Sequence, residues 1–248
     1  MPGPAHSPGL EGGRALAQSI FGDANRFGRL PYSVLPANWT DSNSILDHDV
    51  AASHRTYRYG TEAVLPFGFG TLQRRTGNTA LVSSSVLSSS LLCHPSGLNE
   101  ASTRAGLSLT SFELSFAGAA PQHSSLHTAG DASLNISVTV ANTGKRVGDE
   151  VIQAYFLPSK LPGLKLHPRK AMFDFVRVSD LQPGAKTTVS FSVSADSLLL
   201  ATESGDLVRE PGEYALSIED GAGGELRVPL TVAGERKVVE PFPAVPGK

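Results

Sequence analysis

The chain has 248 residues, of which 40% are hydrophobic and 18% charged, enough for one large or two small folded domains. Its formal net charge of −2 gives no electrostatic basis for a nucleic-acid or anionic-membrane partner, and no apolar run approaches the ~20 residues that cross a bilayer. A single cysteine, Cys93, excludes an internal disulfide and argues against a cysteine-based metal site.

The N-terminal stretch MPGPAHSPGLEGGRALAQ lacks the basic segment followed by an apolar segment that marks a secretory signal. Two triplets, Asn38-Trp39-Thr40 and Asn135-Ile136-Ser137, nevertheless match the N-glycosylation acceptor, which would require export. The sequence therefore leaves the localisation unknown.

The first predicted element is a helix from Gly12 to Phe21. Its apolar residues recur at helical spacing on one face, and Gly22 follows where a helix C-cap needs a residue tolerant of positive φ. The residues from Arg29 to Val34 then begin an extended segment. Because one helix and one short strand cannot bury their own apolar faces, we expect residues 1–70 to belong to something larger and not to fold alone.

The stretch RTYRYGTEAVLPFGFG, residues 55–70, has four aromatic residues, three glycines and one proline. It has no helical period, and its end from Pro66 to Gly70 predicts a turn. Aromatic side chains on a glycine-punctuated loop line a pocket or seal a junction between domains. Residues 73–107 are serine-rich and of low complexity, which predicts a disordered insertion, with a short helix from Val82 to Leu92 as the alternative.

From residue 111 onward, apolar and polar residues alternate with a period of two, which is typical of antiparallel strands with one buried face. Turn signals at residues 142–144, 182–184, 210–212 and 221–224 separate the runs. Seven strands are predicted: 111–116, 133–142, 149–157, 171–179, 186–194, 212–220 and 225–233. They fit an immunoglobulin-like sandwich of the fibronectin type III kind, and Pro229 predicts that the last strand lies on an edge.

Several of these stretches resemble glycoside hydrolase family 3 enzymes. SPGLEGGRALAQSIFGDANRFGRLPYSV, residues 7–34, resembles the end of the family's second domain, and residues 55–70 resemble its following linker. VTVANTGKRVGDEVIQAYFL, LQPGAKTTVSFSV and VREPGEYALSIED are similar to parts of the family's C-terminal fibronectin type III-like domain. The five matches follow the family's order, and the linker and EPGEYALSI look most like β-xylosidase and β-glucosidase members.

The resemblance implies a mainly β fold, a fibronectin type III-like β-sandwich preceded by a truncated remnant of an α/β sandwich domain. We expect the remnant at 1–54, an aromatic linker at 55–72, the insertion at 73–107, the sandwich at 108–234 and a tail at 235–248. The insertion resembles nothing in the family.

In the family, an N-terminal barrel supplies the aspartate nucleophile, and the second domain supplies the acid/base upstream of the helix that begins near Gly12. The resemblance therefore implies a C-terminal fragment of a retaining β-glycosidase without catalytic residues, inactive alone. The intact relative would hydrolyse O-glycosyl bonds of oligosaccharides without a metal or organic cofactor. A separately encoded barrel is one candidate partner. The alternative function is a non-catalytic carbohydrate- or protein-binding β-sandwich module.

Some acidic residues and histidines could be taken for catalytic groups or metal ligands. Asp41 follows Thr40 as in the family's nucleophile motif, but its position after the GRLP segment is wrong, and a solvated turn is favoured. Glu11 is expected to complement the dipole at the start of the predicted helix rather than to act as an acid/base. His48 and His54, with their neighbouring aspartates, match no standard metal-ligand spacing.

Arg55, Tyr57, Arg58 and Tyr59 are the candidate substrate-proximal residues. The resemblance implies that the linker passes close to the substrate cleft of intact relatives, where rings stack on sugars and arginine holds hydroxyls. The competing interpretation, which we favour, is that these side chains pack the linker between two domains.

Overall fold

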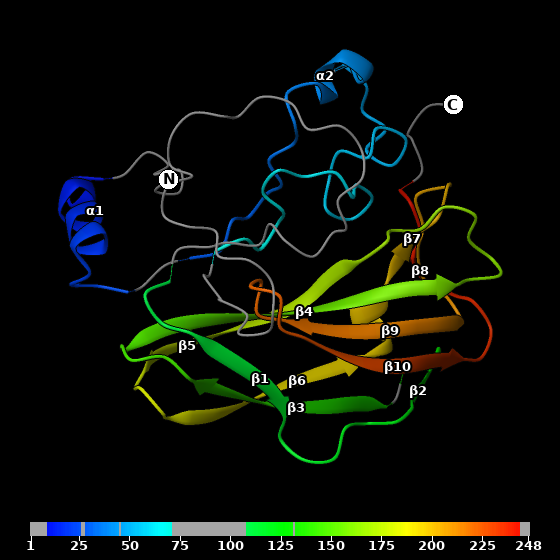
Figure 1. The fold of residues 1–248 in the computed structure, drawn as a ribbon. Coiled ribbons are helices and arrows are strands. Elements are labelled where there is room, and N and C mark those ends of the chain that lie inside the picture. Colours follow the sequence, from blue (N-terminus) through cyan, green and yellow to red (C-terminus); the bar gives the residue numbers. More distant parts are fainter. Residues whose placement is uncertain (1–8, 26–27, 45, 71–107, 131, 244–248) are drawn as a thin grey trace, which may run out of the picture.

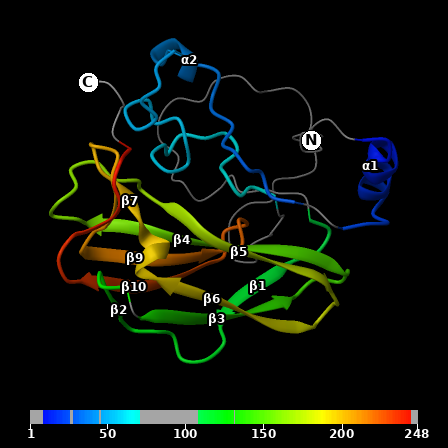
Figure 2. The same ribbon diagram turned by 180° about the vertical axis from the view of Figure 1, so that it is seen from behind.

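The computed structural model describes residues 9–25, 28–44, 46–70, 108–130 and 132–243. The expected insertion at 73–107 therefore lies outside the described residues. Two β-sheets packed face to face form a sandwich, and the N-terminal segment lies over one side of it, above β4 and β5 (Figure 1). Figure 2 shows the same arrangement from behind, with the helix α1 (Gly12–Phe21) standing away from the sheets.

The sandwich is mainly antiparallel. A three-stranded sheet has the order β1-β3-β6, a five-stranded sheet the order β2-β10-β9-β4-β5, and a small sheet the order β11-β8-β7. The strands are β1 (Phe112–Phe116), β2 (Ser124–His127), β3 (Ser133–Asn142), β4 (Gly148–Lys160), β5 (Ala171–Leu181), β6 (Lys186–Ser194), β7 (Leu200–Ala201), β8 (Leu207–Arg209), β9 (Gly212–Glu219), β10 (Glu225–Ala233) and β11 (Lys237–Glu240). The mainly β, fibronectin type III-like prediction is confirmed.

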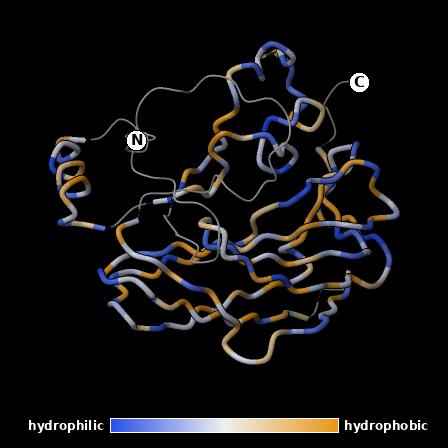
Figure 3. The backbone as a smooth tube through the Cα atoms, in the orientation of Figure 1, coloured by the Kyte–Doolittle hydropathy of each residue, from blue (hydrophilic) through white to orange (hydrophobic). Residues whose placement is uncertain are grey.

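The core forms from the alternating residues that the sequence places on one face. In β3, Ile136, Val138 and Val140 are buried, and in β6 Phe191 and Val193 pack against the same core. Polar residues between them face water, and Figure 3 shows apolar and polar positions interleaved along the strands. This is the pattern expected when one face of each sheet packs on the other.

Strand β4 departs from this alternation because most of its residues are buried on both faces. Ile152, Ala154 and Phe156 belong to the core, whereas Tyr155, on the opposite face, is also 0% exposed. A strand of an antiparallel sheet is buried on both faces only when something covers the outer one. Here the cover is the N-terminal segment.

The prediction that the strand with Pro229 lies on an edge is wrong for its second half. β10 lies between β9 and β2, and β2 pairs with it in parallel from Leu230 to Ala233. The pairing begins immediately after Pro229, which has no N–H to donate. The proline therefore limits where β2 can pair instead of placing the strand outside the sheet.

The helix prediction is confirmed at both ends, since α1 spans Gly12–Phe21 and Gly22 adopts the left-handed φ of 82°. Sequence patterns missed the short strands β2, β7, β8 and β11, and β11 forms within the expected tail by pairing with β8. α2 (Trp39–Ser42) and the 3-10 turn η2 (Ala195–Leu198) complete the elements. Among the described residues, no helix is long and apolar enough to cross a membrane.

Replacing Phe191 by alanine should destabilise the chain by ~3–5 kcal/mol, because its fully buried ring leaves a cavity between the sheets. Phe175→Ala is the matched control, since that ring is 59% exposed and its loss should cost less than ~1 kcal/mol. Urea denaturation of both variants measures the difference. Equal effects would contradict the assigned core.

Candidate functional site

The aromatic linker is fixed to the sandwich through the ring of Tyr57. This ring stacks on Phe67 with centroids 4.2 Å apart and meets Tyr155 of β4 edge-on at 6.1 Å. The Tyr57 hydroxyl accepts a hydrogen bond of 3.2 Å from the backbone N–H of Met172 in β5. Aromatic pairs of these geometries add ~0.5–1.5 kcal/mol each beyond the burial of their area. We call this contact region, together with the buried charges of Arg29, Glu150 and Asp220 beside it, the linker joint.

Tyr155 lies at the base of the linker joint and is held by polar neighbours. Its hydroxyl donates to Gln153 Oε1 at 3.0 Å, and Lys170 Nζ lies 4.1 Å from the ring centroid. Lys170 in turn pairs with Glu219 at 3.1 Å. Burial raises the pKa of Tyr155, and the carboxylate of Glu219 raises it further. The phenol therefore stays neutral and keeps its proton for the bond to Gln153.

The backbone of the linker also bonds to the loop between β4 and β5. The Arg169 N–H donates to the carbonyl of Arg58 at 2.6 Å. Pro66 to Phe69 form the predicted turn, with Gly68 at φ 80°, where the Phe69 N–H donates to the Pro66 carbonyl at 3.1 Å. A Cβ on Gly68 would also collide with Gln153. Glycine is required here both for its φ and for the close approach of the turn to β4.

A buried ion pair lies beside the rings. Arg29 pairs with Glu150 of β4, and their side chains are 6% and 1% exposed. Glu150 Oε1 also accepts from the Val151 N–H at 2.9 Å, whereas Glu150 Oε2 and Arg29 Nη1 have no hydrogen-bond partner among the described residues. Each charge thus depends on the other for compensation, since either one buried alone would be costly.

Asp220, in the turn between β9 and β10, is the third buried charge at the linker joint. Burial lowers the pKa of Arg29 to about 10, against the opposing attraction of the Asp220 carboxylate, so the guanidinium stays charged at neutral pH. Burial also raises the pKa of Asp220, although its carboxylate accepts from the N–H groups of Ala222 at 2.7 Å and Gly224 at 2.8 Å.

A second attachment lies at the C-terminal end of α1. Asn25 is buried and accepts from the Leu109 N–H at 3.0 Å, and it donates to the Val147 carbonyl at 3.3 Å. Arg146 donates to the Gly22 carbonyl at 3.0 Å. The end of the helix is therefore tied to the sandwich, although α1 itself has no buried residue.

The structure separates the four candidate substrate-proximal residues. Tyr57 lies inside the linker joint, whereas Arg55 donates to the carbonyls of Ser44 and Asp47 at 2.9 and 2.5 Å. Arg55 also lies 5.6 Å from the Trp39 ring centroid. The side chain of Arg58 is exposed, and Tyr59 is half-buried. Packing thus accounts for Tyr57 and Arg55, and contact of these four residues with a substrate stays a prediction.

The sequence favours no catalytic or metal-binding role for Asp41, Glu11, His48 and His54, and the structure shows where they lie. Asp41 is exposed in α2, and Glu11 lies at the N-cap of α1, where it pairs with Arg14 at 3.7 Å. In the described part of the chain, His48 and His54 form no cluster of three or more metal-ligating side chains.

One surface hollow of about 360 Å³, beside the end of α1, is lined by Asp23, Asp149 and Asp180. Asp149 is buried and both its oxygens are occupied, one by Arg177 at 2.6 Å and the other by the Asp180 N–H at 2.8 Å. Its carboxylate therefore holds β4 and β5 together.

Sequence reasoning missed the charged members of the linker joint, Arg29, Glu150 and Asp220. The available signal was Glu150, which directly precedes VIQAYFL, a run that is apolar except for Gln153. A carboxylate at the start of a strand buried on both faces requires a cation from elsewhere in the chain. Which cation supplies the charge depends on a long-range contact that spacing does not reveal.

A model for a fibronectin type III-like domain matches residues 150–222. The probable exo-1,4-beta-xylosidase bxlB of Aspergillus fumigatus is 30% identical over 243 residues, covering 96% of this chain and 28% of that protein. The exo-1,4-beta-xylosidase bxlB of Emericella nidulans is 28% identical over 240 residues, covering 95% of this chain and 27% of that protein. The chain thus spans little more than a quarter of these curated relatives.

Solved structures show the same fold. A GH3 exo-beta-xylosidase (XlnD), in complex with a xylobiose aziridine probe, superimposes with a TM-score of 0.70 at 24% identity, covering 96% of this chain and 28% of that one. Beta-glucosidase 3B from Thermotoga neapolitana, in complex with glycerol, gives a TM-score of 0.60 at 22% identity, covering 94% and 28%. Both likenesses include the N-terminal segment as well as the sandwich.

Replacing Arg29 by methionine should destabilise the docked N-terminal segment by ~3–5 kcal/mol, because Glu150 would stay buried without its counter-charge. The double variant Arg29→Met, Glu150→Leu removes both charges and should recover most of this loss. Limited proteolysis within residues 28–70, together with urea denaturation, measures both. Losses that simply add in the double variant would contradict the pairing.

Asp220 binds a proton more readily in the folded than in the unfolded chain, because burial raises its pKa from 3.8. Its stabilising contribution is therefore complete below pH 3.8 and is lost as the pH rises through the folded-state pKa. Asp220→Asn keeps the accepting oxygen but does not titrate. The stability of the unsubstituted chain relative to this variant should fall as pH rises from about 4, as measured by urea denaturation across pH. A constant difference would refute the burial effect.

Proposed function

We propose that this chain is the C-terminal, non-catalytic part of a retaining β-glycosidase. The support is that the chain corresponds, over almost its whole length, to the C-terminal part of glycoside hydrolase family 3 enzymes of the β-xylosidase and β-glucosidase type. The substrate class would be oligosaccharides with terminal β-linked xylose or glucose. The reaction would need no metal or organic cofactor. The catalytic barrel would come from the same polypeptide or from a separately encoded one.

The linker joint supports a positioning role for the linker within this proposal. Tyr57 is locked between Phe67 and Tyr155, and the Arg58 carbonyl is bonded to Arg169. The linker backbone is thereby immobilised on a rigid sheet while the Arg58 side chain extends into solvent. A positioning role fits this arrangement, because a group held in advance loses less conformational freedom when it binds a substrate.

The chemistry of the described residues agrees with a non-catalytic role. Retaining hydrolysis uses two carboxyl groups about 5 Å apart on either side of the sugar. In the hollow beside α1, the buried carboxylate of Asp149 is bonded to Arg177 and to the backbone of Asp180. Glu150 and Asp220, the buried carboxylates of the linker joint, face Arg29. We propose that both catalytic carboxylates lie outside this chain.

A chimera tests the positioning role. This chain would replace the matching C-terminal quarter of the Aspergillus fumigatus relative, and Arg58→Ala in the chimera should raise KM for an aryl-β-xyloside about tenfold with little change in stability, through loss of a charged hydrogen bond. Arg227→Ala, an exposed arginine on β10, is the matched control and should leave KM unchanged.

The isolated chain should hydrolyse neither aryl-β-xyloside nor aryl-β-glucoside. Turnover by the purified chain would overturn the non-catalytic assignment. An unchanged KM in the Arg58→Ala chimera would remove that residue from the substrate side and leave the linker with a packing role only.

A further inference from the structure

The outer face of the sheet β1-β3-β6 carries short, uncharged polar side chains. In each strand these residues alternate with residues that pack into the core. They are Ser115 of β1, Ser133, Asn135, Ser137 and Thr139 of β3, and Thr188, Ser190, Ser192 and Ser194 of β6. The hydroxyls of Ser137 and Ser190 lie 2.9 Å apart across the two strands. We call this surface the hydroxyl face.

Charged groups lie only at the ends of the hydroxyl face, among the residues that the structure describes. Glu113 of β1 and Lys186 of β6 both pair with Ala141 of β3 at one end. Just beyond β6 at the other end, Asp196 is already paired with Arg209 at 2.6 Å. A soluble surface typically has about 25–35% charged residues. The middle of this face therefore lacks the groups that ordinarily keep a surface hydrated and separate from other chains.

Strand β6 is also a long edge strand of its sheet. It spans 9 residues and pairs with β3 without a shift in register. From Thr187 to Ser194 it has neither a charged residue nor a proline. Charges, prolines and bulges are the devices that keep edge strands from pairing with another chain. Since β6 has none of them over this length, a bulky hydrophilic group beside it would supply the missing protection.

Asn135 projects from the hydroxyl face and begins the acceptor triplet Asn135-Ile136-Ser137. Ile136 is 2% exposed in the core, so Asn135 and Ser137 point to the opposite, exposed side of β3. Asn135 is opposite Ser192 of β6, whose side chain is short, and the pairing of β3 with β1 ends at Val138 before it reaches Asn135. The side-chain amide thus has open space around it.

The position of β3 keeps this site away from the linker joint. In Figure 1, β3 lies on the lower side of the sandwich, whereas the N-terminal segment lies on the upper side. A group attached at Asn135 would therefore cover the hydroxyl face without reaching the linker.

We propose that Asn135 is an N-glycosylation site and that its oligosaccharide covers the hydroxyl face beside β6. The donor is an oligosaccharide linked to a polyprenyl diphosphate. The amide nitrogen of Asn135 forms a bond to the anomeric carbon of the donor, the bond from that carbon to the diphosphate oxygen breaks, polyprenyl diphosphate leaves and the nitrogen loses one proton. An N-linked glycan is bulky and solubilising, as this face requires. The proposal places the chain in a secretory pathway and does not rest on the glycosidase assignment.

The test is expression of the full chain behind a cleavable secretion signal in a eukaryotic host. The variant Asn38→Gln serves as the background, because it removes the other acceptor triplet of the sequence. We expect a gain in mass that N-glycosidase F removes, with Asn135 converted to aspartate in the corresponding peptide. Ser137→Ala should abolish the glycan. Ser133→Ala, an exposed serine of the same strand outside the triplet, is the matched control and should keep it.

The covering role has its own measurement. Removing the glycan from the folded chain should lower its solubility several-fold, because the uncharged edge of β6 becomes free to associate. Ser192→Lys places a charge on β6 opposite Asn135 and should restore the solubility of the deglycosylated chain. Ser125→Lys, at an exposed position of β2 in the other sheet, is the matched control and should not restore it.

Both the secreted and the cell-retained protein are analysed, so that poor secretion does not hide the result. An unmodified Asn135 in both pools would overturn the site, as would a glycan that survives Ser137→Ala. Solubility that is the same with and without the glycan would overturn the covering role. None of these measurements reads hydrolysis or KM, so their outcome is independent of the chimera experiment.

Discussion

The buried pairing of Arg29 with Glu150 is the constraint on which the rest of the arrangement depends. Glu150 lies near the start of β4, opposite Val178 of β5, and its side chain is 1% exposed. A lone carboxylate there would be strongly disfavoured, so the N-terminal segment must bring its guanidinium to that point. Next to Arg29, the Leu30 N–H donates to the Phe69 carbonyl at 2.8 Å, and the Gly68 N–H donates to the Leu30 carbonyl at 2.8 Å, which holds the turn at Gly68 in place.

The linker covers the outer face of β4. Ile152, Ala154 and Phe156 of β4 belong to the core between the sheets, whereas Tyr155 lies on the other side of the strand, where water would otherwise reach the ring. Tyr57, stacked on Phe67, covers the Tyr155 ring by meeting it edge-on. Lys170 lies over the same Tyr155 ring. The aromatic stretch that stands out in the sequence is therefore a cover for one strand, and the groups left exposed, such as Arg58, are those free to meet another molecule.

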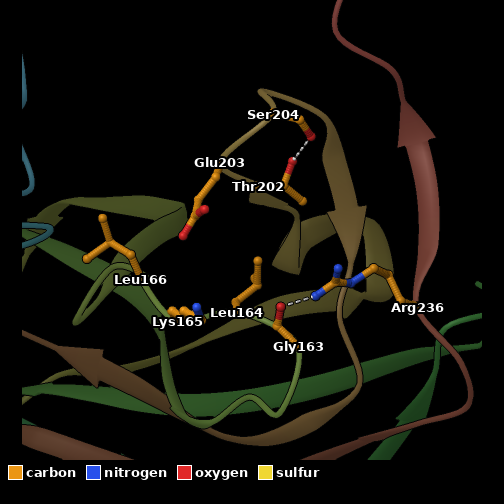
Figure 4. Close-up of a pocket in the computed structure, with 8 residues that line it drawn as sticks. All are labelled: Gly163, Leu164, Lys165, Leu166, Thr202, Glu203, Ser204 and Arg236. Atoms are coloured by element: carbon orange, nitrogen blue, oxygen red, sulfur yellow. Dashed lines mark hydrogen bonds between the residues drawn. The ribbon is translucent and has the colours of Figure 1, made fainter.

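Within the sandwich, the loop between β4 and β5 connects two polar surfaces. Its Arg169 and Lys170 end contacts the linker and Tyr155, and its Gly163 end bonds to Arg236 beside the hollow of Figure 4. Glu210, almost fully buried, accepts from the Gly163 N–H at 3.1 Å and pairs with Arg236. At the other end of the loop, Lys170 pairs with Glu219 at 3.1 Å.

Local patterns in the sequence determined the elements. The spacing of Leu16, Ile20 and Phe21 with Gly22 after them defines α1 at both ends, and the period of two defines the long strands, because these features depend only on neighbouring residues. Short strands such as β2 and β11 carry too few residues for a period to be recognised, and they exist because a partner strand is present.

What only the tertiary structure decided is which charges and rings meet. The family motifs implied the order of the parts, but not which side chains meet. Glu150 pairs with Arg29, Tyr155 meets Tyr57 and Asp149 bonds to Arg177, and each partner comes from a different segment of the chain. A side chain's spacing predicts its face, whereas its counter-charge depends on how separate segments dock, and that docking is set by burial and charge compensation across the whole fold.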